Sequence, residues 1–429
     1  MPRWRWILTQ LTRRLWVRAT LIGLMGVAAA ILAAVVERFI PFDFPTDIGS
    51  DAVGSILNII ASSMLAVTTF SLSVMTAAYG AATSNVTPRA TRLLIEDRVT
   101  QNVLSTFIGS FLFGVVGIVV LSTGAYGDRG RFVLFVVTVV VIVLIVLSLL
   151  RWIDHLTRLG RVGETTERVE QAARRAIEAR LEEPYLGGRP LREVPVDAEP
   201  MGAEQVGYVQ HIDMAVLSHC CEQFDADIFL GAIPGTFVYP DTPIAWIGSH
   251  SEEAGSDMLD AVHKAFTIGN ERSFDQDPRF GLVVMSEIGS RALSAAINDS
   301  GTAIDVIGRI TRLMALWAES CERDGTELLH PRVHVPALPS EDMFEDAFML
   351  MARDGAGLIE IQLRIQKALW ALSRLGNAGY RAAALHQASL ARGRAEAALV
   401  FEADKARLDA VAAEVSGGPG RAGPGAAAR

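Results

Sequence analysis

Apolar residues are concentrated in the first third of the chain, in four stretches without Asp, Glu, Lys or Arg. The stretches are Ala19–Val36, Ala52–Pro88, Val99–Gly127 and Phe132–Leu150. Each is long enough for the ~20 helical residues that cross a ~30 Å hydrocarbon core. The pattern predicts a membrane domain over residues 1–155 with four transmembrane helices, at about 19–37, 53–79, 102–124 and 132–151.

The first apolar stretch follows several arginines and could be taken for a secretory signal. The stretch is long, however, and the "ERFIPFDF" after it is a poor small-residue cleavage site. We therefore expect a retained helix, which makes this a multi-pass protein.

Arginines around the apolar stretches predict the orientation, because basic flanks resist translocation. The outer segments hold only Arg38, Arg129 and Arg131. The other flanks, which we expect on the cytoplasmic side, hold Arg3, Arg5, Arg13, Arg14, Arg18, Arg89, Arg92, Arg98, Arg151, Arg158 and Arg161. The prediction is a protein of the bacterial inner membrane with both termini cytoplasmic. The three cysteines all lie in the part predicted to be cytoplasmic, which suits a reducing compartment.

The second apolar stretch carries polar and small residues at spacings of three and four, which places them on one face of a helix. One interpretation is close helix packing, with hydroxyls bonding across helices or to the preceding turn. The other is a hydrated path lined by copies of this helix, with hydroxyls replacing part of an ion's water shell. The candidate pore-lining residues are Ser55, Asn58, Ser62, Thr69, Ser73 and Thr76.

Beyond the membrane domain, the pattern predicts a charged helix and linker over 156–206, a cytoplasmic α+β domain over 207–415, and a disordered tail over 416–429. "GYVQHI" predicts a strand, and the helix after it is capped by Asp213. The segment around Pro234-Gly235 predicts two strands and is similar to half of a biotinyl or lipoyl barrel. It contains no lysine, so we expect a small structural β unit. The fold class is thus a membrane all-α domain followed by a mainly helical α+β domain.

Polar residues surround an amphipathic segment at 274–303. Asp277 and Pro278 are typical of a helix start, and the pattern predicts a helix to about Ile297 with a Glu287–Arg291 pair. "NDSG" ends it, and Thr302 with Asp305 predicts a capping box for the next helix. We interpret this set as a structural polar network or subunit contact, with a regulatory ligand site as the alternative. The candidates are Arg272, Asp277, Glu287, Arg291, Asn298, Asp299 and Thr302.

Several classes of function are disfavoured by the sequence. The net charge is −9 and only three of 39 basic residues are lysines, so we expect no nucleic-acid partner. Phosphate-binding, dinucleotide and nucleophile-elbow motifs are absent, and we expect neither a cofactor nor an enzyme. Cys220 and Cys221 are predicted to be core thiols. His330 and His334 have the spacing of a metal pair, but their proline-rich segment cannot form one helical face, so we expect no metal site.

Several of these segments resemble a known family. "TPRATRLLIEDRVTQNVLSTFIGSFLF", "PGTFVYPDTPIA" and "RALSAAIND", together with Arg272, Gln276-Asp277, Phe280-Gly281 and Thr302-Ala303, are similar to the bacterial predicted membrane proteins grouped as domain of unknown function 2254. The likeness spans roughly residues 10–400. It implies a cell-membrane protein with this layout and supplies no established activity or residue roles.

The leading hypothesis is a homo-oligomeric channel or transport-like protein, with the second helix at its centre and the cytoplasmic domain as the assembly or gating element. The expected partners are the lipid bilayer, further copies of the chain, and an ion or small regulatory ligand. The alternative is a membrane-tethered regulatory scaffold that conducts nothing.

Overall fold

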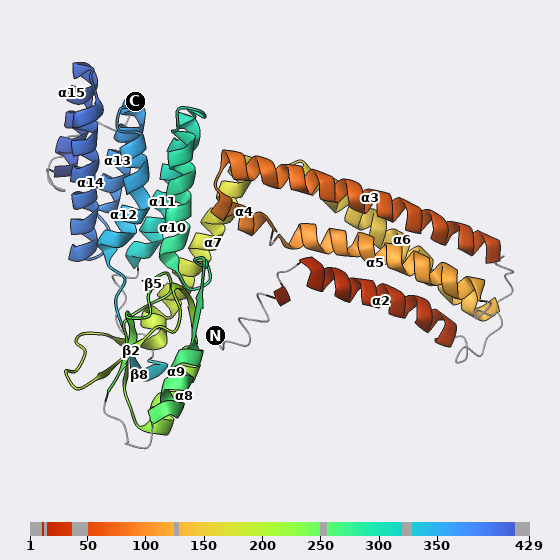
Figure 1. Cartoon of the computed structure of the whole chain (residues 1–429). Coiled ribbons are helices and arrows are strands. Elements are labelled where there is room, and N and C mark those ends of the chain that lie inside the picture. Colours follow the sequence, from red (N-terminus) through yellow and green to blue (C-terminus); the bar gives the residue numbers. More distant parts are fainter. Residues whose placement is uncertain are drawn as a thin grey trace. The chain divides into compact units, whose positions relative to one another are not determined.

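The computed structural model describes residues 11–12, 15–36, 50–95, 97–123, 128–248, 255–319 and 328–416. These residues form two compact units (Figure 1). The first, here called the apolar unit, comprises the described residues up to 84 together with 91–164. The second, here called the α+β unit, comprises 85–90 and the described residues from 165 onward. The predicted tail lies outside the described residues except for Ser416.

The apolar unit contains the predicted membrane helices. They are α2 (Leu15–Val36), α3 (Ser50–Asn85), α5 (Arg98–Ser122) and α6 (Asp128–Leu156). Three of them hold stretches long and apolar enough to cross a membrane: Ala52–Ser84, Arg98–Ser122 and Gly130–Leu156. The described apolar part of α2, Trp16–Leu32, is shorter. Three spans are therefore supported, and the fourth stays a prediction.

Helices of the apolar unit approach closely at glycines of α5. A Cβ on Gly109 would lie 2.8 Å from the side chain of Ile22 in α2, and one on Gly114 would lie 3.0 Å from the backbone oxygen of Leu57 in α3. Small residues let helix backbones pack in this way where the hydrophobic effect cannot drive association. The buried face of α3, including Leu57 and Met64, therefore packs inside the chain.

Helix α3 is a single helix of 36 residues, without the break near Gly80 that its length could have required. After it, α4 (Pro88–Ile95) begins at Pro88, since proline is well suited to the first position of a helix. The end of α3 at Asn85 and the turn before α4 belong to the α+β unit.

The α+β unit begins with α7 (Val162–Glu182), the predicted charged helix, followed by a 3-10 turn at Pro184–Gly187. A five-stranded mixed sheet has the order β1-β8-β4-β6-β2, and a three-stranded antiparallel sheet has the order β5-β3-β7. The strands are β1 (Gly188–Pro190), β2 (Glu199–Gly202), β3 (Gly207–Ile212), β4 (Ile228–Leu230), β5 (Phe237–Val238), β6 (Pro243–Ile247), β7 (Phe266–Gly269) and β8 (His330–Val335).

These sheets correct two predictions. The segment 184–206 is not only a linker, because β1 and β2 pair with β8 and β6. The Pro234-Gly235 segment is flanked by three strands divided between both sheets, not by two strands of one unit. The strand at "GYVQHI" and the Asp213 cap of the helix after it are confirmed; the Asp213 carboxylate accepts from the Val216 N–H.

The remaining helices lie mostly beyond the sheets. They are α8 (Met214–Phe224), α9 (Gly255–Ala265), α10 (Pro278–Ala292), α11 (Ser300–Ala318), α12 (Ser340–Asp354), α13 (Ile359–Leu372), α14 (Ala378–Ala398) and α15 (Glu402–Ser416). Figure 1 shows α10 to α15 side by side as a helical layer. Helix α10 ends at Ala292 and not near Ile297, because Asn298 takes a left-handed conformation (φ 51°) in the turn to α11.

Helix α10 packs against α7 at a contact that leaves no space for a side chain. A Cβ on Gly281 would lie 2.3 Å from the Cβ of Ala173. The two helix backbones can approach this closely only because glycine and alanine face each other. The contact fixes α10 against α7 one turn after the start of α10, within the amphipathic segment at 274–303.

Candidate functional site

All six candidate pore-lining residues of α3 are exposed on the single chain. They form what we call the polar face of α3: Ser55, Asn58, Ser62, Thr69, Ser73 and Thr76. At about 100° per residue, this face lies opposite the buried face that includes Leu57, Met64 and Met75. Packing among the described residues therefore leaves this face open.

The hydroxyls of the polar face bond mostly to their own helix. Ser62 Oγ donates to the Asn58 carbonyl oxygen at 2.8 Å, and Thr69 and Thr76 donate to the carbonyls four residues earlier at 3.0 and 2.9 Å. The Asn58 amide differs, because it makes no hydrogen bond to any residue that the structure describes. Its two N–H donors and its oxygen are open to an outside partner.

Large apolar side chains border the polar face along both edges. Ile59 and Phe70 lie along one edge, and Leu65 and Leu72 along the other; their exposed fractions are 64%, 64%, 53% and 40%. The exposed side of α3 is thus a polar strip between two apolar margins. Such a surface can contact neighbouring helices or lipid at its margins while the strip faces something polar.

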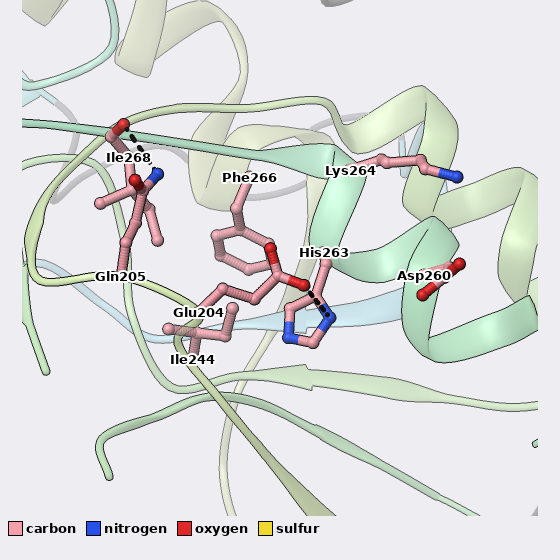
Figure 2. Close-up of a pocket in the computed structure, with 8 residues that line it drawn as sticks. All are labelled: Glu204, Gln205, Ile244, Asp260, His263, Lys264, Phe266 and Ile268. Carbon is pink, nitrogen blue, oxygen red and sulfur yellow. Dashed lines mark hydrogen bonds and ion pairs between the residues drawn. The ribbon is translucent and has the colours of Figure 1, made fainter. Parts of the chain in front are cut away.

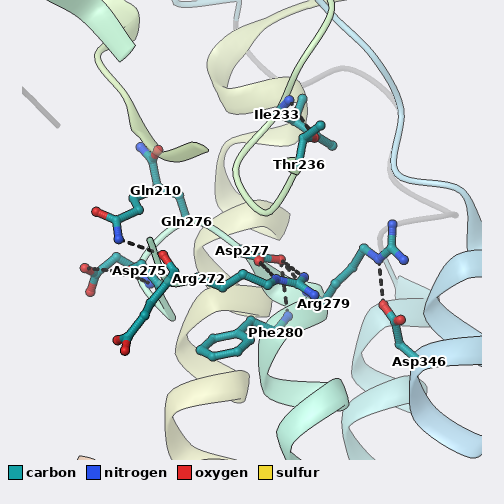
Figure 3. A network of polar contacts seen from close by, with 12 residues as sticks. Gln210, Ile233, Thr236, Arg272, Asp275, Gln276, Asp277, Arg279, Phe280 and Asp346 are labelled. Atoms are coloured by element: carbon teal, nitrogen blue, oxygen red, sulfur yellow. Dashed lines mark hydrogen bonds and ion pairs between the residues drawn. The ribbon is translucent and has the colours of Figure 1, made fainter. Parts of the chain in front are cut away.

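In the α+β unit, Asp277 is the centre of a buried polar network (Figure 3). Its side chain is 1% exposed and accepts two bonds from Arg272, at 2.7 and 3.0 Å. It also caps α10 by accepting from the N–H groups of Arg279 and Phe280. Burial raises the pKa of Asp277, and the Arg272 guanidinium opposes that rise. The predicted cap is confirmed, and Arg272 fixes it from the other side.

Two neighbouring residues join this network to other elements. The Gln276 amide accepts from the Ile212 N–H at 2.9 Å, which ties α10 to the end of β3. Arg180 of α7 is 7% exposed and donates to the Gln276 carbonyl oxygen at 3.3 Å. Burial lowers the pKa of Arg180 to about 10, with the Asp277 charge acting in the opposite direction. No local spacing in the sequence indicates a role for Arg180, because its partner lies 96 residues away.

Glu287 and Arg291 do not form the predicted pair. Glu287 instead accepts from the hydroxyl of Thr87, in the turn before α4, at 3.0 Å and from the guanidinium of Arg89, in the first turn of α4, at 2.5 Å. The half-buried Arg291 side chain has no hydrogen bond or ion pair with a described residue. A partner 198 residues away in sequence thus displaces the one-turn neighbour.

Asn298, Asp299 and Thr302 form a separate helix start. The Asp299 carboxylate accepts from the backbone N–H of Thr302 at 3.0 Å and from its hydroxyl at 2.6 Å, so Asp299 is the N-cap of α11. Asp305, predicted in a capping box with Thr302, pairs with Arg309 instead. Six of the seven candidates therefore occupy three separate places: the Asp277 network, the Glu287 contact and the α11 cap. Arg291 belongs to none of them.

A small pocket lies elsewhere in the α+β unit (Figure 2). Its volume is about 250 Å³, and Glu204, Asp260, His263 and Lys264 line it with Phe266. Glu204 lies 3.4 Å from His263 Nδ1, and His263 Nε2 lies 3.0 Å from the Gly202 carbonyl oxygen. Glu204 and His263 thus contact each other at the pocket. The pocket shares no residue with the predicted sites.

Among the described residues, no group of His, Cys, Asp and Glu could hold a metal ion. His330 and His334 lie on β8, where burial lowers the pKa of both rings. Cys220 and Cys221 are buried free thiols, and burial raises the pKa of Cys221 to about 12. Such thiols are poor nucleophiles at neutral pH.

Two further polar clusters were not predicted. In the apolar unit, His155 Nε2 of α6 lies 3.0 Å from both the Asp97 carboxylate and the Thr100 hydroxyl at the start of α5. In the α+β unit, Glu170 of α7 contacts Arg309 and Arg312 of α11 at 2.7 and 2.8 Å. Both join residues far apart in sequence, so no local spacing could have indicated them.

One unit contains long apolar helices, and the other is a mixed α+β unit. This combination is typical of a membrane protein. The family model described as predicted membrane protein (DUF2254) matches residues 12–371, and the chain belongs to that family. Uncharacterised proteins of Mycobacterium bovis and Mycobacterium tuberculosis are each 32% identical over 127 residues, 29% of this chain and 24% of theirs. The chain thus matches about a quarter of the length of these relatives. No solved structure matches.

Proposed function

We propose that this chain is a multi-pass protein of the bacterial inner membrane that assembles with copies of itself into a channel or transport-like protein. In this proposal the polar faces of α3 meet around a hydrated path. The observation that carries it is the exposure of the whole polar face on a helix whose opposite side is packed within the chain.

Asn58 supplies an energetic reason for a polar partner on this face. An amide without a hydrogen-bond partner costs about 4–8 kcal/mol to move from water into hydrocarbon. The Asn58 amide has no partner within the described chain, so a lipid-facing position in the hydrocarbon would be unfavourable. Water in a path, or another copy of the chain, would supply that partner.

The apolar margins support an assembly of several copies. In a ring of α3 helices, the strip around Ser62 and Thr69 would face the centre, while the margins bearing Phe70 and Leu65 would contact neighbouring helices. Strip hydroxyls and Asn58 could then replace part of the water shell of an ion or small polar solute. The number of apolar spans in each copy is at least three in this proposal, and four if α2 also crosses.

The alternative is a membrane-tethered regulatory scaffold that conducts nothing. Hydroxyls that donate to their own helix favour it, because serine and threonine satisfied in this way can face other helices or lipid at little cost. Asn58 would then bond across an interface between two copies.

Flux through liposomes that contain the purified protein separates the two. We expect ion flux that Ser62→Phe and Thr69→Phe block, because a ring placed on the strip fills the path. Leu65→Phe is the matched control, since it adds a ring to an exposed position at the margin. Silent liposomes with folded wild-type protein would favour the scaffold, and equal block by the control would show that the polar face does not line the path.

Reporter fusions test the proposed orientation. A fusion after Tyr126 should report the periplasm, and fusions after Arg161 and Val415 should report the cytoplasm. A periplasmic signal at Val415 would contradict the four-span arrangement, and an odd number of spans would produce it.

A further inference from the structure

Helix α10 contacts both segments through which the chain passes between the apolar unit and the α+β unit. The chain leaves the apolar unit at the end of α3, re-enters it within α4, and leaves it again near the start of α7. Glu287 of α10 contacts the turn between α3 and α4, and Gly281 of α10 contacts α7. The amphipathic segment that the sequence singled out thus lies where both connections meet.

The turn between α3 and α4 is anchored in the α+β unit. Val86 and Ala90 are 0% exposed, and Thr87 is 4% exposed. The Thr87 hydroxyl donates to one carboxylate oxygen of Glu287, and Arg89 donates to the other. The Glu287 carboxylate therefore binds Thr87 of the turn and Arg89 of α4, just after the end of α3.

The second connection is held more tightly. The Gly281–Ala173 contact admits no larger side chain, and Glu170 one turn earlier on α7 binds two arginines of α11. Because α7 is held in this way, the first turns of α10 pack against a helix that is itself fixed. The Glu287 contact lies nearer the other end of the helix.

Two ion pairs, Arg272–Asp277 at the N-terminus of α10 and Arg89–Glu287 further along it, differ in their exposure to solvent. Arg272 and Asp277 are 17% and 1% exposed, as in a permanent joint, whereas Arg89 and Glu287 are 57% and 20% exposed. A solvent-exposed ion pair contributes little and is screened by salt. The Arg89–Glu287 pair is therefore expected to be weaker than the buried Arg272–Asp277 pair, and its strength should fall as salt rises.

We propose that Glu287 is a latch through which the α+β unit controls the position of α3. This inference rests on the proposed function, because it treats α3 as the helix that lines the path. Since α3 runs from Ser50 to Asn85 without a break, a change at its end reaches the polar face as a shift of the whole helix. Rotation of α10, or neutralisation of Glu287, would release the turn and change the path.

Hydrogen exchange of the full-length protein tests the latch without requiring conduction. Glu287→Ala should speed amide exchange in residues 81–90 by about tenfold, which corresponds to about 1.4 kcal/mol. Helices α12 to α14 should keep their wild-type protection. Arg291→Ala is the matched control, because Arg291 lies one turn away on α10 and has no partner among the described residues.

A charge exchange sharpens the test. Glu287→Arg or Arg89→Glu alone should speed exchange in the turn, and the two together should restore most of its protection. The inference is overturned if Glu287→Ala resembles Arg291→Ala, if exchange rises equally throughout the helical layer, or if the charge exchange restores nothing.

Flux measurements then connect the latch to the proposed function. If the wild-type protein conducts, Glu287→Ala should change the open fraction while leaving the block by Thr69→Phe intact, and an unchanged open fraction would overturn the control of α3. If no variant conducts but the turn still loosens selectively, the proposed function fails and the latch at the end of α3 stands.

Discussion

The two units differ in what their polar side chains contact. In the α+β unit, Asp277 and Glu170 are held by arginines of the same chain. On α3 of the apolar unit, the hydroxyls of Ser62 and Thr69 bond within their own helix, and the polar face is exposed among the described residues. Buried acids of the α+β unit thus find their partners within the chain, whereas the polar face of α3 stays open. The predictions below test each side of this contrast.

The largest effect is expected at the buried network. Asp277→Ala removes the carboxylate between Arg272 and the α10 N-terminus, which leaves buried cations unpaired and should cost about 3–5 kcal/mol of folding free energy. Asp305→Ala is the control, because its ion pair with Arg309 is half exposed and contributes about 0–1 kcal/mol. Chemical unfolding in detergent measures both. Equal losses would show that the network is not the distinguishing feature of the α+β unit.

The next-largest effect is expected on the side of α3 that packs against α5, and it can be compared with a substitution on the exposed polar face. Gly114→Leu places a side chain against the Leu57 backbone oxygen and the Ala61 Cβ, 3.0 and 3.2 Å from the added Cβ, and should destabilise the apolar unit by about 1–3 kcal/mol. Ser62→Leu, on the open side, should leave the stability of the detergent-solubilised monomer nearly unchanged. Thermal unfolding followed by circular dichroism distinguishes them. A large loss from Ser62→Leu in the monomer would mean that the polar face packs within the chain after all.

A smaller effect is expected at the α11 cap. Asp299→Ala should cost about 0.5–1 kcal/mol, the low end for an N-cap, because the site is exposed. Hydrogen bonds from Thr302 lower the pKa of Asp299 in the folded protein. The stabilisation is therefore fully present above the unfolded pKa of about 3.9, and it is lost as pH falls through the folded value. Unfolding curves of wild type and variant between neutral and acidic pH should converge at the acidic end.

The smallest effect is expected at Arg291 of α10. Because its side chain has no described partner, Arg291→Ala and Arg291→Lys should each change stability by about 0.5 kcal/mol or less. Had Arg291 joined Glu287 to Asn298, the alanine variant would have left both unpaired. A loss of several kcal/mol would indicate a partner outside the described residues or in another copy.

Local signals in the sequence predicted the helix starts well. Asp213, Asp277 and Pro278 all stand where the structure begins a helix, because a cap or an N-terminal proline acts within three residues. The end of α10 was placed too late, since the apolar spacing continues through Leu293 and Ala296 while the chain turns. The N–H of Asp299 bonds to the Ala292 carbonyl there, which no periodicity indicates.

The sheets and the charged contacts depended on distant partners. Strand β1 contains only three residues and forms because β8, more than a hundred residues later, pairs with it. Glu287 had a suitable arginine one turn away, and the fold gave it Arg89 instead. The polar face of α3 was predicted as a face, since helical spacing fixes it, but its exposure depended on α5 packing against the opposite side.

The length of α3 has a consequence for the thickness of the surrounding bilayer. Its 36 residues span about 54 Å, against a hydrocarbon core of ~30 Å and about 37 Å for the 25 residues of α5. A typical tilt of about 20° shortens that span by only a few ångströms. Hydrophobic mismatch would therefore act on α5 first, whereas α3 is long enough to cross a thicker hydrocarbon core as well. Serine and threonine recur along most of α3, so a similar strip would lie at the centre of bilayers of different thickness.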